Sequence, residues 1–150
     1  DYFSKSKIKK NQKNYYNDDR FIPIFIEDKI NFINYDGIQF HIDKKYKIVA
    51  MGGVLNFKNN FKECKNKQKI IDREFKKTLS NATREESGIK SHTGDTSGKS
   101  KYVSIYYDFT SQDFISITCY DWSEKMPYYD NLRVSIITKK FQDWINTDAY

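Results

Sequence analysis

The feature that most constrains the fold is an amphipathic segment over residues 57–79. Its inward positions recur at steps of three and four residues, which is the spacing of one face of an α-helix. This stripe consists of Phe57, Phe61, Cys64, Gln68, Ile71 and Phe75. Gln68 is its only polar member, and lysine, asparagine, arginine and glutamate fill most of the other positions. The pattern predicts a helix over about residues 56–79, with Asn56 as its N-cap.

The two cysteines of the chain both lie on faces that favour burial. Cys64 belongs to the helical stripe, and Cys119 shares one face of an alternating strand with Ile115 and Ile117. A helix lying across the sheet would bring the two sulfurs together, so we predict a disulfide between Cys64 and Cys119. The alternative is two separate buried thiols. A bridge implies an oxidising compartment, and in the chain-entropy model it stabilises the fold by about 4 kcal/mol.

Apolar and polar residues alternate on both sides of the helix, which predicts strands. The expected strands span residues 21–27, 29–35, 38–43, 46–51, 102–109, 114–122 and 132–136. Pro23 favours an edge position for the first strand, because proline cannot donate to a ladder. Asp36-Gly37 is typical of a two-residue hairpin turn. Residues 80–101 lack a pattern and are expected to form a long polar loop.

The predicted fold class is α+β. We expect a mainly antiparallel sheet of about five to seven strands, with the long helix and a short C-terminal helix packed on one face as a two-layer sandwich. Thr138 would cap the short helix, and Phe141, Trp144 and Ile145 would face inward. Residues 21–150 are expected to form a single domain.

Residues 1–20 read as a polar basic N-terminal arm. Its lysines are Lys5, Lys7, Lys9, Lys10 and Lys13. The arm is either a solvated tail or a segment that contacts a partner or an anionic surface. The net charge of +6 arises from 26 basic and 20 acidic residues, and such mixing is typical of an ordinary solvated surface rather than of one class of partner.

Three features bear on localisation. No apolar run approaches the roughly 18 residues of a membrane span. The sequence starts at Asp1 rather than methionine, so we expect a removed signal peptide or a piece of a longer protein. Asn81-Ala82-Thr83 fits the N-glycosylation sequon. Together with the predicted disulfide, these features favour a secreted or periplasmic protein.

The sequence indicates no cofactor and no metal site. Residues 94–100 resemble a phosphate-binding loop, but the glycine spacing is one residue short and a strand follows where a helix is required. His41 is predicted on the outward face of a strand with Asp43 two residues later, and His92 lies in the polar loop near Asp95. Neither histidine has a predicted nucleophile or third metal ligand beside it.

Carboxylates near residues 121–130 are the remaining enzymatic option. Asp121, Glu124 and Asp130 surround Trp122 and two tyrosines. Sugar-cleaving sites use two carboxylates, so one hypothesis is a small hydrolase that acts on a glycan or a similar polar substrate. The alternative is a polar loop whose aromatic residues cover the end of the sheet.

An aromatic surface is the second candidate site. Outward strand positions and the following loop carry Tyr102, Tyr106, Tyr120, Trp122, Tyr128 and Tyr129. Exposed aromatic patches mark binding sites, although the polar loop or the N-terminal arm could instead cover this face. Single-stranded nucleic acid also binds aromatic residues beside basic ones, but several aspartates lie near the same face.

The leading functional hypothesis is a non-catalytic binding or accessory domain outside the cytoplasm. It would act as a subunit of an assembly, an inhibitor or an immunity-type protein, and its partner would be another protein. The carboxylate hydrolase is the first alternative. A basic nucleic-acid-binding module is the second, and the acidic residues near the aromatic surface make nucleic acid the less favoured partner.

Overall fold

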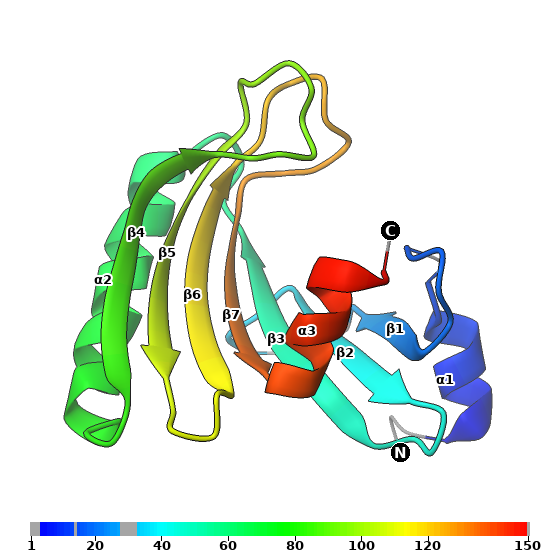
Figure 1. Ribbon diagram of the computed structural model, residues 1–150. Helices are drawn as coiled ribbons and strands as arrows, with labels where there is room; N and C mark the ends of the chain where they lie inside the picture. The colour runs from blue at the N-terminus through cyan, green and yellow to red at the C-terminus, as the bar shows by residue number, and fades with distance from the viewer. Residues whose placement is uncertain (1–3, 14, 28–32, 150) are drawn as a thin grey trace.

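The structure, a computed structural model, describes residues 4–13, 15–27 and 33–149 (Figure 1). The helices are α1 (Lys5–Asn11), α2 (Phe61–Thr78) and α3 (Lys139–Thr147). The strands are β1 (Phe21–Ile26), β2 (Gly37–Asp43), β3 (Ile48–Asn56), β4 (Thr83–Ser91), β5 (Lys101–Asp108), β6 (Phe114–Asp121) and β7 (Asn131–Ile137).

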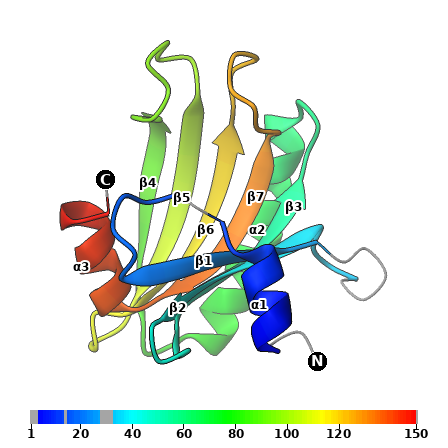
Figure 2. The ribbon, with the colours of Figure 1, turned by 90° about the vertical axis from the view of Figure 1, so that its right-hand side faces the viewer.

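All seven strands form one antiparallel sheet. Their order is β1-β2-β3-β7-β6-β5-β4, so the first three strands of the chain form one end and the last four form the other. The sheet curls strongly between these ends, with α2 on one side, against β6 and β7, and with α3 on the opposite side (Figures 1 and 2). The predicted α+β class and the edge position of β1 are confirmed.

Helix α2 forms where its stripe was predicted, but it begins later. Asn60 is its N-cap and accepts a hydrogen bond from the Glu63 backbone N–H, whereas Asn56 is the last residue of β3. The stripe packs on a buried cluster of Val103, Ile105, Tyr107, Ile117 and Leu132. Gln68, its polar member, is buried and donates to the backbone carbonyls of Val103 and Ile117 at 3.0 and 2.6 Å.

The predicted disulfide is confirmed. Cys64 of α2 and Cys119 of β6 are bonded, both are completely buried, and their Cα atoms lie 5.9 Å apart. The bond joins the middle of the sheet to the helix that covers it. We call the side of the sheet that carries Cys119 the α2 face.

An ion-pair network fixes the outer flank of α2. Asp72 is buried and receives the Arg84 side chain in a two-bond arrangement at 2.7 and 3.2 Å. Its carboxylate also accepts the Tyr107 hydroxyl at 2.6 Å. Burial alone would raise the pKa of Asp72, but these hydrogen bonds and one from Lys76 lower it below its ordinary value. Burial and the bond to Asp72 raise the pKa of Tyr107 to about 12.

The C-terminal helix packs on the other side of the sheet. Residues directly opposite in antiparallel strands share a face, and the register places Ala50 with Ile137, on the side that Leu132 does not share. Phe141 and Trp144 of α3 pack against Phe21 in the cluster that contains Ala50. The expectation that both helices share one face is therefore corrected, although Thr138 is the N-cap as predicted. We call this side the α3 face.

The N-terminal arm contains regular structure. Ser4 caps α1, and Ile8 is buried in a cluster with Ile24, Ile26, Phe40 and Ile42. The Lys13 N–H donates to the Pro23 carbonyl at 2.9 Å, so the arm runs along the edge of β1. A single apolar residue gives no periodic signal, which is why the sequence pattern did not predict α1.

Three local predictions are corrected. The expected loop over residues 80–101 contains β4, an exposed edge strand interrupted by a bulge near Gly88, whose φ is +65°. Residues 29–35 were expected to form a strand; residues 29–32 lie outside the described residues, and residues 33–35 are not a strand. Gly37 begins β2 with a negative φ, so Asp36-Gly37 is not the two-residue turn that was expected.

The strand expected over residues 46–51 is also corrected, because β3 runs from Ile48 through Gly52 and Gly53 to Asn56. A side chain at Gly52 would meet the Ser135 hydroxyl at 2.5 Å, so glycine here permits the close packing of β3 on β7. In the part of the chain that the structure describes, none of the helices is long and apolar enough to span a membrane.

Candidate functional site: the aromatic tip

One end of the α3 face carries a group of aromatic rings in mutual contact. Tyr102 and Tyr120 are directly opposed on β5 and β6, with ring centroids 6.2 Å apart. Tyr120 stacks on Trp122 at 5.4 Å and an interplanar angle of 8°, and Trp122 meets Tyr128 at 4.8 Å. This arrangement follows from the alternation of β6, because Tyr120 and Trp122 point to the same side.

His92 completes the group. Its ring lies 4.5 Å from Trp122, 5.9 Å from Tyr120 and 6.0 Å from Tyr102. The Gly94 N–H donates to His92 Nδ1 at 3.1 Å, which places the ring proton of the neutral form on Nε2. Burial lowers the pKa of His92, and the charge of Asp95 offsets part of that effect. We define the aromatic tip as His92, Tyr102, Tyr120, Trp122 and Tyr128.

A buried carboxylate holds together the two loops that carry His92, Trp122 and Tyr128. Asp95 accepts hydrogen bonds from the hydroxyls of Ser97, Ser100 and Ser123 and from two backbone N–H groups. The bonds to Ser100 and Ser97 hold the pKa of Asp95 well below its usual range. Ser123 belongs to the loop at residues 122–130, so its bond to Asp95 joins that loop to the one at residues 92–100.

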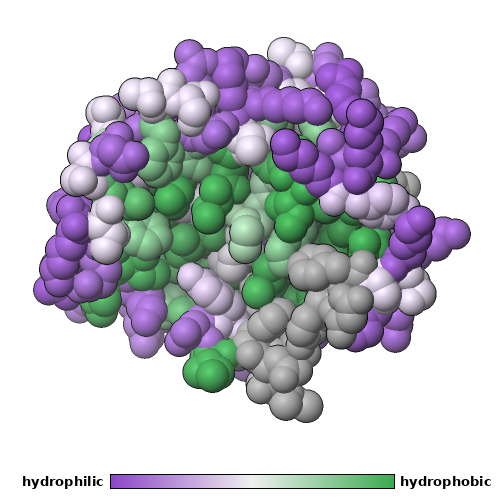
Figure 3. Space-filling view, turned by 90° about the horizontal axis from the view of Figure 1, so that it is seen from below, coloured by the Kyte–Doolittle hydropathy of each residue, from purple (hydrophilic) through white to green (hydrophobic). Residues whose placement is uncertain are grey.

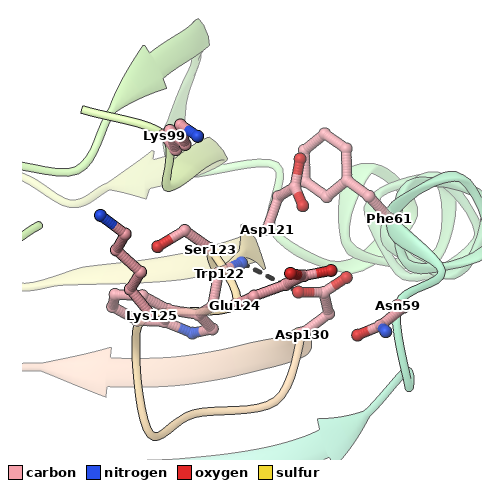
Figure 4. A pocket seen from close by; sticks show the side chains of 9 residues that line it. All are labelled: Asn59, Phe61, Lys99, Asp121, Trp122, Ser123, Glu124, Lys125 and Asp130. Carbon is pink, nitrogen blue, oxygen red and sulfur yellow. Dashed lines mark hydrogen bonds between the residues drawn. The ribbon is translucent and has the colours of Figure 1, made fainter. Parts of the chain in front are cut away.

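The three candidate carboxylates line one cleft beside the tip (Figure 4). The cleft has a volume of about 440 Å³ and includes Asp121, Glu124, Asp130, Trp122, Lys99 and Lys125 in its lining. Asp130 is buried, and its carboxylate accepts the Trp122 backbone N–H at 2.9 Å. Burial, with a smaller contribution from the Asp121 charge, raises the pKa of Asp130.

Arg133 lies in the middle of the α3 face, next to the tip. It is half-buried, directly opposite Thr118 of β6, with its guanidinium 5.9 Å from the Tyr120 ring centroid. Its Nη1 donates to Gln39 Oε1 at 3.0 Å. Burial raises the pKa of Tyr120, and the Arg133 charge offsets part of that rise.

The structure brings together four of the six aromatic residues that the sequence singled out: Tyr102, Tyr120, Trp122 and Tyr128. Tyr106 shares the face but packs on Phe114, at 6.0 Å. Tyr129 is 66% exposed, and Tyr128 is 55% exposed. No pattern in the sequence linked His92 to these aromatic residues. Arg133 could have been recognised from the sequence, because it is a charged residue at an outward position between Leu132 and Val134 of a central strand.

His41 does not occupy the outward position that was expected. It is buried beneath α3, where its ring lies 4.4 Å from Phe141, and its Nε2 is 3.0 Å from the Tyr16 hydroxyl. Burial, together with the nearby Arg133 charge, lowers the pKa of His41 to about 3. Asp43 instead accepts backbone N–H groups of the following turn, from Lys45 and Lys47.

The comparisons with known proteins leave the chain unassigned. No family model matches the chain, and no curated protein or solved structure is significantly similar to it. Among the residues that the structure describes, no group of three or more histidine, cysteine or acidic side chains is arranged to hold a metal ion.

Proposed function

We propose that this chain is a disulfide-stabilised binding domain of an oxidising compartment, secreted or periplasmic, and that the aromatic tip captures its partner. The domain would act without catalysis, as an accessory subunit, inhibitor or immunity-type protein. The Cys64–Cys119 disulfide supports the compartment, because such bonds persist where thiols are not kept reduced.

The observation that carries the proposal is the contact of five rings at one end of the sheet. Tyr102 and Tyr120 lie on strands β5 and β6, and the other three rings lie on two loops that are tied together. Tyrosine and tryptophan supply large contact areas and lose little side-chain freedom on binding. Asp95 joins the two supporting loops, so the rings are positioned before a partner arrives. In this surface, Tyr128 is exposed and Trp122 is half-buried.

Capture of the native partner tests the proposal. The double variant Trp122→Ala, Tyr128→Ala is expected to lose at least tenfold in partner affinity, with the thermal midpoint lowered by only a few degrees. The matched control is Tyr46→Ala, because Tyr46 is 51% exposed but lies in the turn between β2 and β3. Capture that survives in the double variant would contradict the proposal.

The thiol state of the native protein tests its compartment. Denatured protein from its natural source, kept unreduced, should contain no titratable thiol. Two free thiols would contradict an oxidising compartment without affecting the assignment of the aromatic tip.

A second candidate function is hydrolysis of a glycan or similar polar substrate in the cleft beside the tip. It is favoured by the three carboxylates in that cleft and by the direction of the Asp130 pKa, since a raised pKa suits a proton donor. Release of reducing ends from a glycan panel by the wild-type chain, and its loss in Asp130→Asn and Glu124→Gln, would support this function. Absence of release would leave binding as the proposal.

The same carboxylates disfavour nucleic acid as the partner. Asp121, Glu124 and Asp130 would repel a phosphate backbone at the tip. Binding that weakens steeply with added salt would support a nucleic-acid partner, and salt-insensitive binding would argue against it.

A further inference from the structure

Arg133 is a cation without an acidic partner in the described part of the chain. The ion pairs of that part involve other residues, although Arg133 is half-buried on the central strand β7. Its hydrogen bond and its ring contact both go to neutral groups, the Gln39 amide oxygen and the Tyr120 ring. A half-buried charge is costly unless it is paired, so this position favours an anion from outside.

Unpaired polar atoms gather around the same point. Among the described residues, four buried side-chain polar atoms lack a hydrogen-bond partner, and three of them are Arg133 Nε, Asn131 Oδ1 and Trp122 Nε1. Asn131 is two residues from Arg133 on the same face and is directly opposite Tyr120, on which Trp122 stacks. Native interiors pair nearly all such groups, so a cluster of three indicates a place where a ligand completes the bonding.

The chemistry of the three groups limits the ligand. Arg133 Nη1 is engaged with Gln39, which leaves the Nε and Nη2 edge, a geometry that matches the two oxygens of a carboxylate. The Trp122 indole donates and the Asn131 oxygen accepts, and a hydroxyl can pair with both kinds of group. Tyr120 and Trp122 offer a flat surface for a ring.

A polyanion fits the site poorly. Asp121, Glu124 and Asp130 line the cleft beside Trp122, and their charges would repel a ligand that carries several negative charges. The fitting ligand therefore has one carboxylate, hydroxyl groups and a ring. We infer that the aromatic tip and Arg133 together bind a carboxylated sugar, with its carboxylate on Arg133 and its ring on Tyr120 and Trp122.

This inference rests on the proposed function, because it specifies what the tip recognises on its partner. The test is a pair of matched probes, methyl glucuronide and methyl glucoside, titrated into the full chain by calorimetry and tryptophan fluorescence. The wild-type chain should bind the glucuronide at least tenfold more tightly than the glucoside. Equal affinity for the two probes, or no binding of either, would overturn the inference.

Two arginine variants separate a local role from a change in overall charge. Arg133→Met should reduce the ratio of the affinities for the glucuronide and the glucoside to about one. Arg73→Met removes the same charge from an exposed position on α2 and should leave the preference unchanged. An unchanged preference in Arg133→Met would overturn the inference, and the comparison of probes on the wild-type chain remains decisive if that variant does not fold.

The inference and the proposed function can fail separately. If Trp122→Ala, Tyr128→Ala loses the native partner but Arg133→Met captures it normally, the tip is a binding site and the sugar inference is wrong. If adenosine monophosphate displaces the native partner and methyl glucuronide does not bind, Arg133 would be assigned to a phosphate. This result would likewise overturn the carboxylated sugar.

Discussion

The two faces of the sheet differ in whether their buried polar groups have hydrogen-bond partners. On the α2 face the buried polar side chains are paired: Gln68 bonds two backbone carbonyls, and Asp72 bonds Arg84 and Tyr107. The four buried polar atoms without a partner in the described residues lie on the α3 face or on α3 itself. The last of them is Trp144 Nε1.

This difference separates stability from recognition. Fully paired polar groups under a disulfide-bonded helix hold the α2 face in one arrangement. Unpaired groups beside exposed rings are costly for folding alone, and sites of this kind are where proteins bind ligands. The comparison predicts that substitutions on the α2 face change stability most, whereas substitutions near the tip change binding most.

Removing the disulfide is expected to have the largest effect. Cys64→Ser with Cys119→Ser should lower the free energy of unfolding by about 4 kcal/mol, the loop-entropy value for a closure of this length. Urea unfolding measures the change, and reduction of the wild-type chain is the control. A loss below about 1 kcal/mol would show that the bond does not hold the α2 face.

Acid is expected to loosen the α3 face before the α2 face. The folded-state pKa of His41, about 3, lies below its unfolded value of about 6.5, so acid favours the unfolded chain, which takes up the proton. Stability should be complete above about pH 6.5 and should fall by about 1.4 kcal/mol per pH unit below it, or about 3 kcal/mol at pH 4.5.

Denaturant unfolding as a function of pH measures this slope. His41→Gln should flatten the slope of stability against pH between pH 6.5 and 4.5. His92→Gln alters a more exposed ring and should leave most of that slope unchanged. Asp72 has a lowered pKa, so its contribution is complete above about pH 4 and is lost only below that value. Simultaneous loosening of both faces near pH 6 would contradict the comparison.

Arg84→Met should destabilise the chain by about 2 kcal/mol. It leaves the buried Asp72 carboxylate without its main partner, which costs 3 to 5 kcal/mol in a fully buried pair. The Arg84 side chain is 27% exposed, so water offsets part of that loss. Thermal and urea unfolding measure the effect, and the variant should retain the binding properties of the tip.

Arg133→Met is the matched substitution on the α3 face and should have the smallest effect on stability. It removes a half-buried cation that has no acidic partner in the described residues, so the change should stay within about 1 kcal/mol in either direction. A loss as large as that of Arg84→Met would mean that Arg133 serves the fold, and the proposed division between the two faces would be wrong.

The sequence was most informative where burial is periodic. The stripe through Cys64 and Gln68 predicted α2, and the alternation in β6 placed Cys119 on the face that meets it. By contrast, β4 has one neighbouring strand and is largely exposed, so it carries no apolar alternation to recognise. The same limit applies to α1, in which Ile8 is the only buried residue.

The candidate site was predictable in part for a related reason. Alternation along β5 and β6 placed Tyr102 and Tyr120 on one face, and the structure adds their contact with Trp122. His92 could not be linked to them, because its position depends on how Asp95 folds the loop at residues 92–100. His41 was misplaced because its burial depends on α3, which is distant in sequence.

The Asp95 hydrogen bonds also have a kinetic consequence. A surface whose supporting loops are already fastened to each other needs little rearrangement when a partner arrives. Encounter should then be limited by diffusion and orientation rather than by a slow conformational step, and differences in affinity among partners should arise mainly from how long each complex lasts.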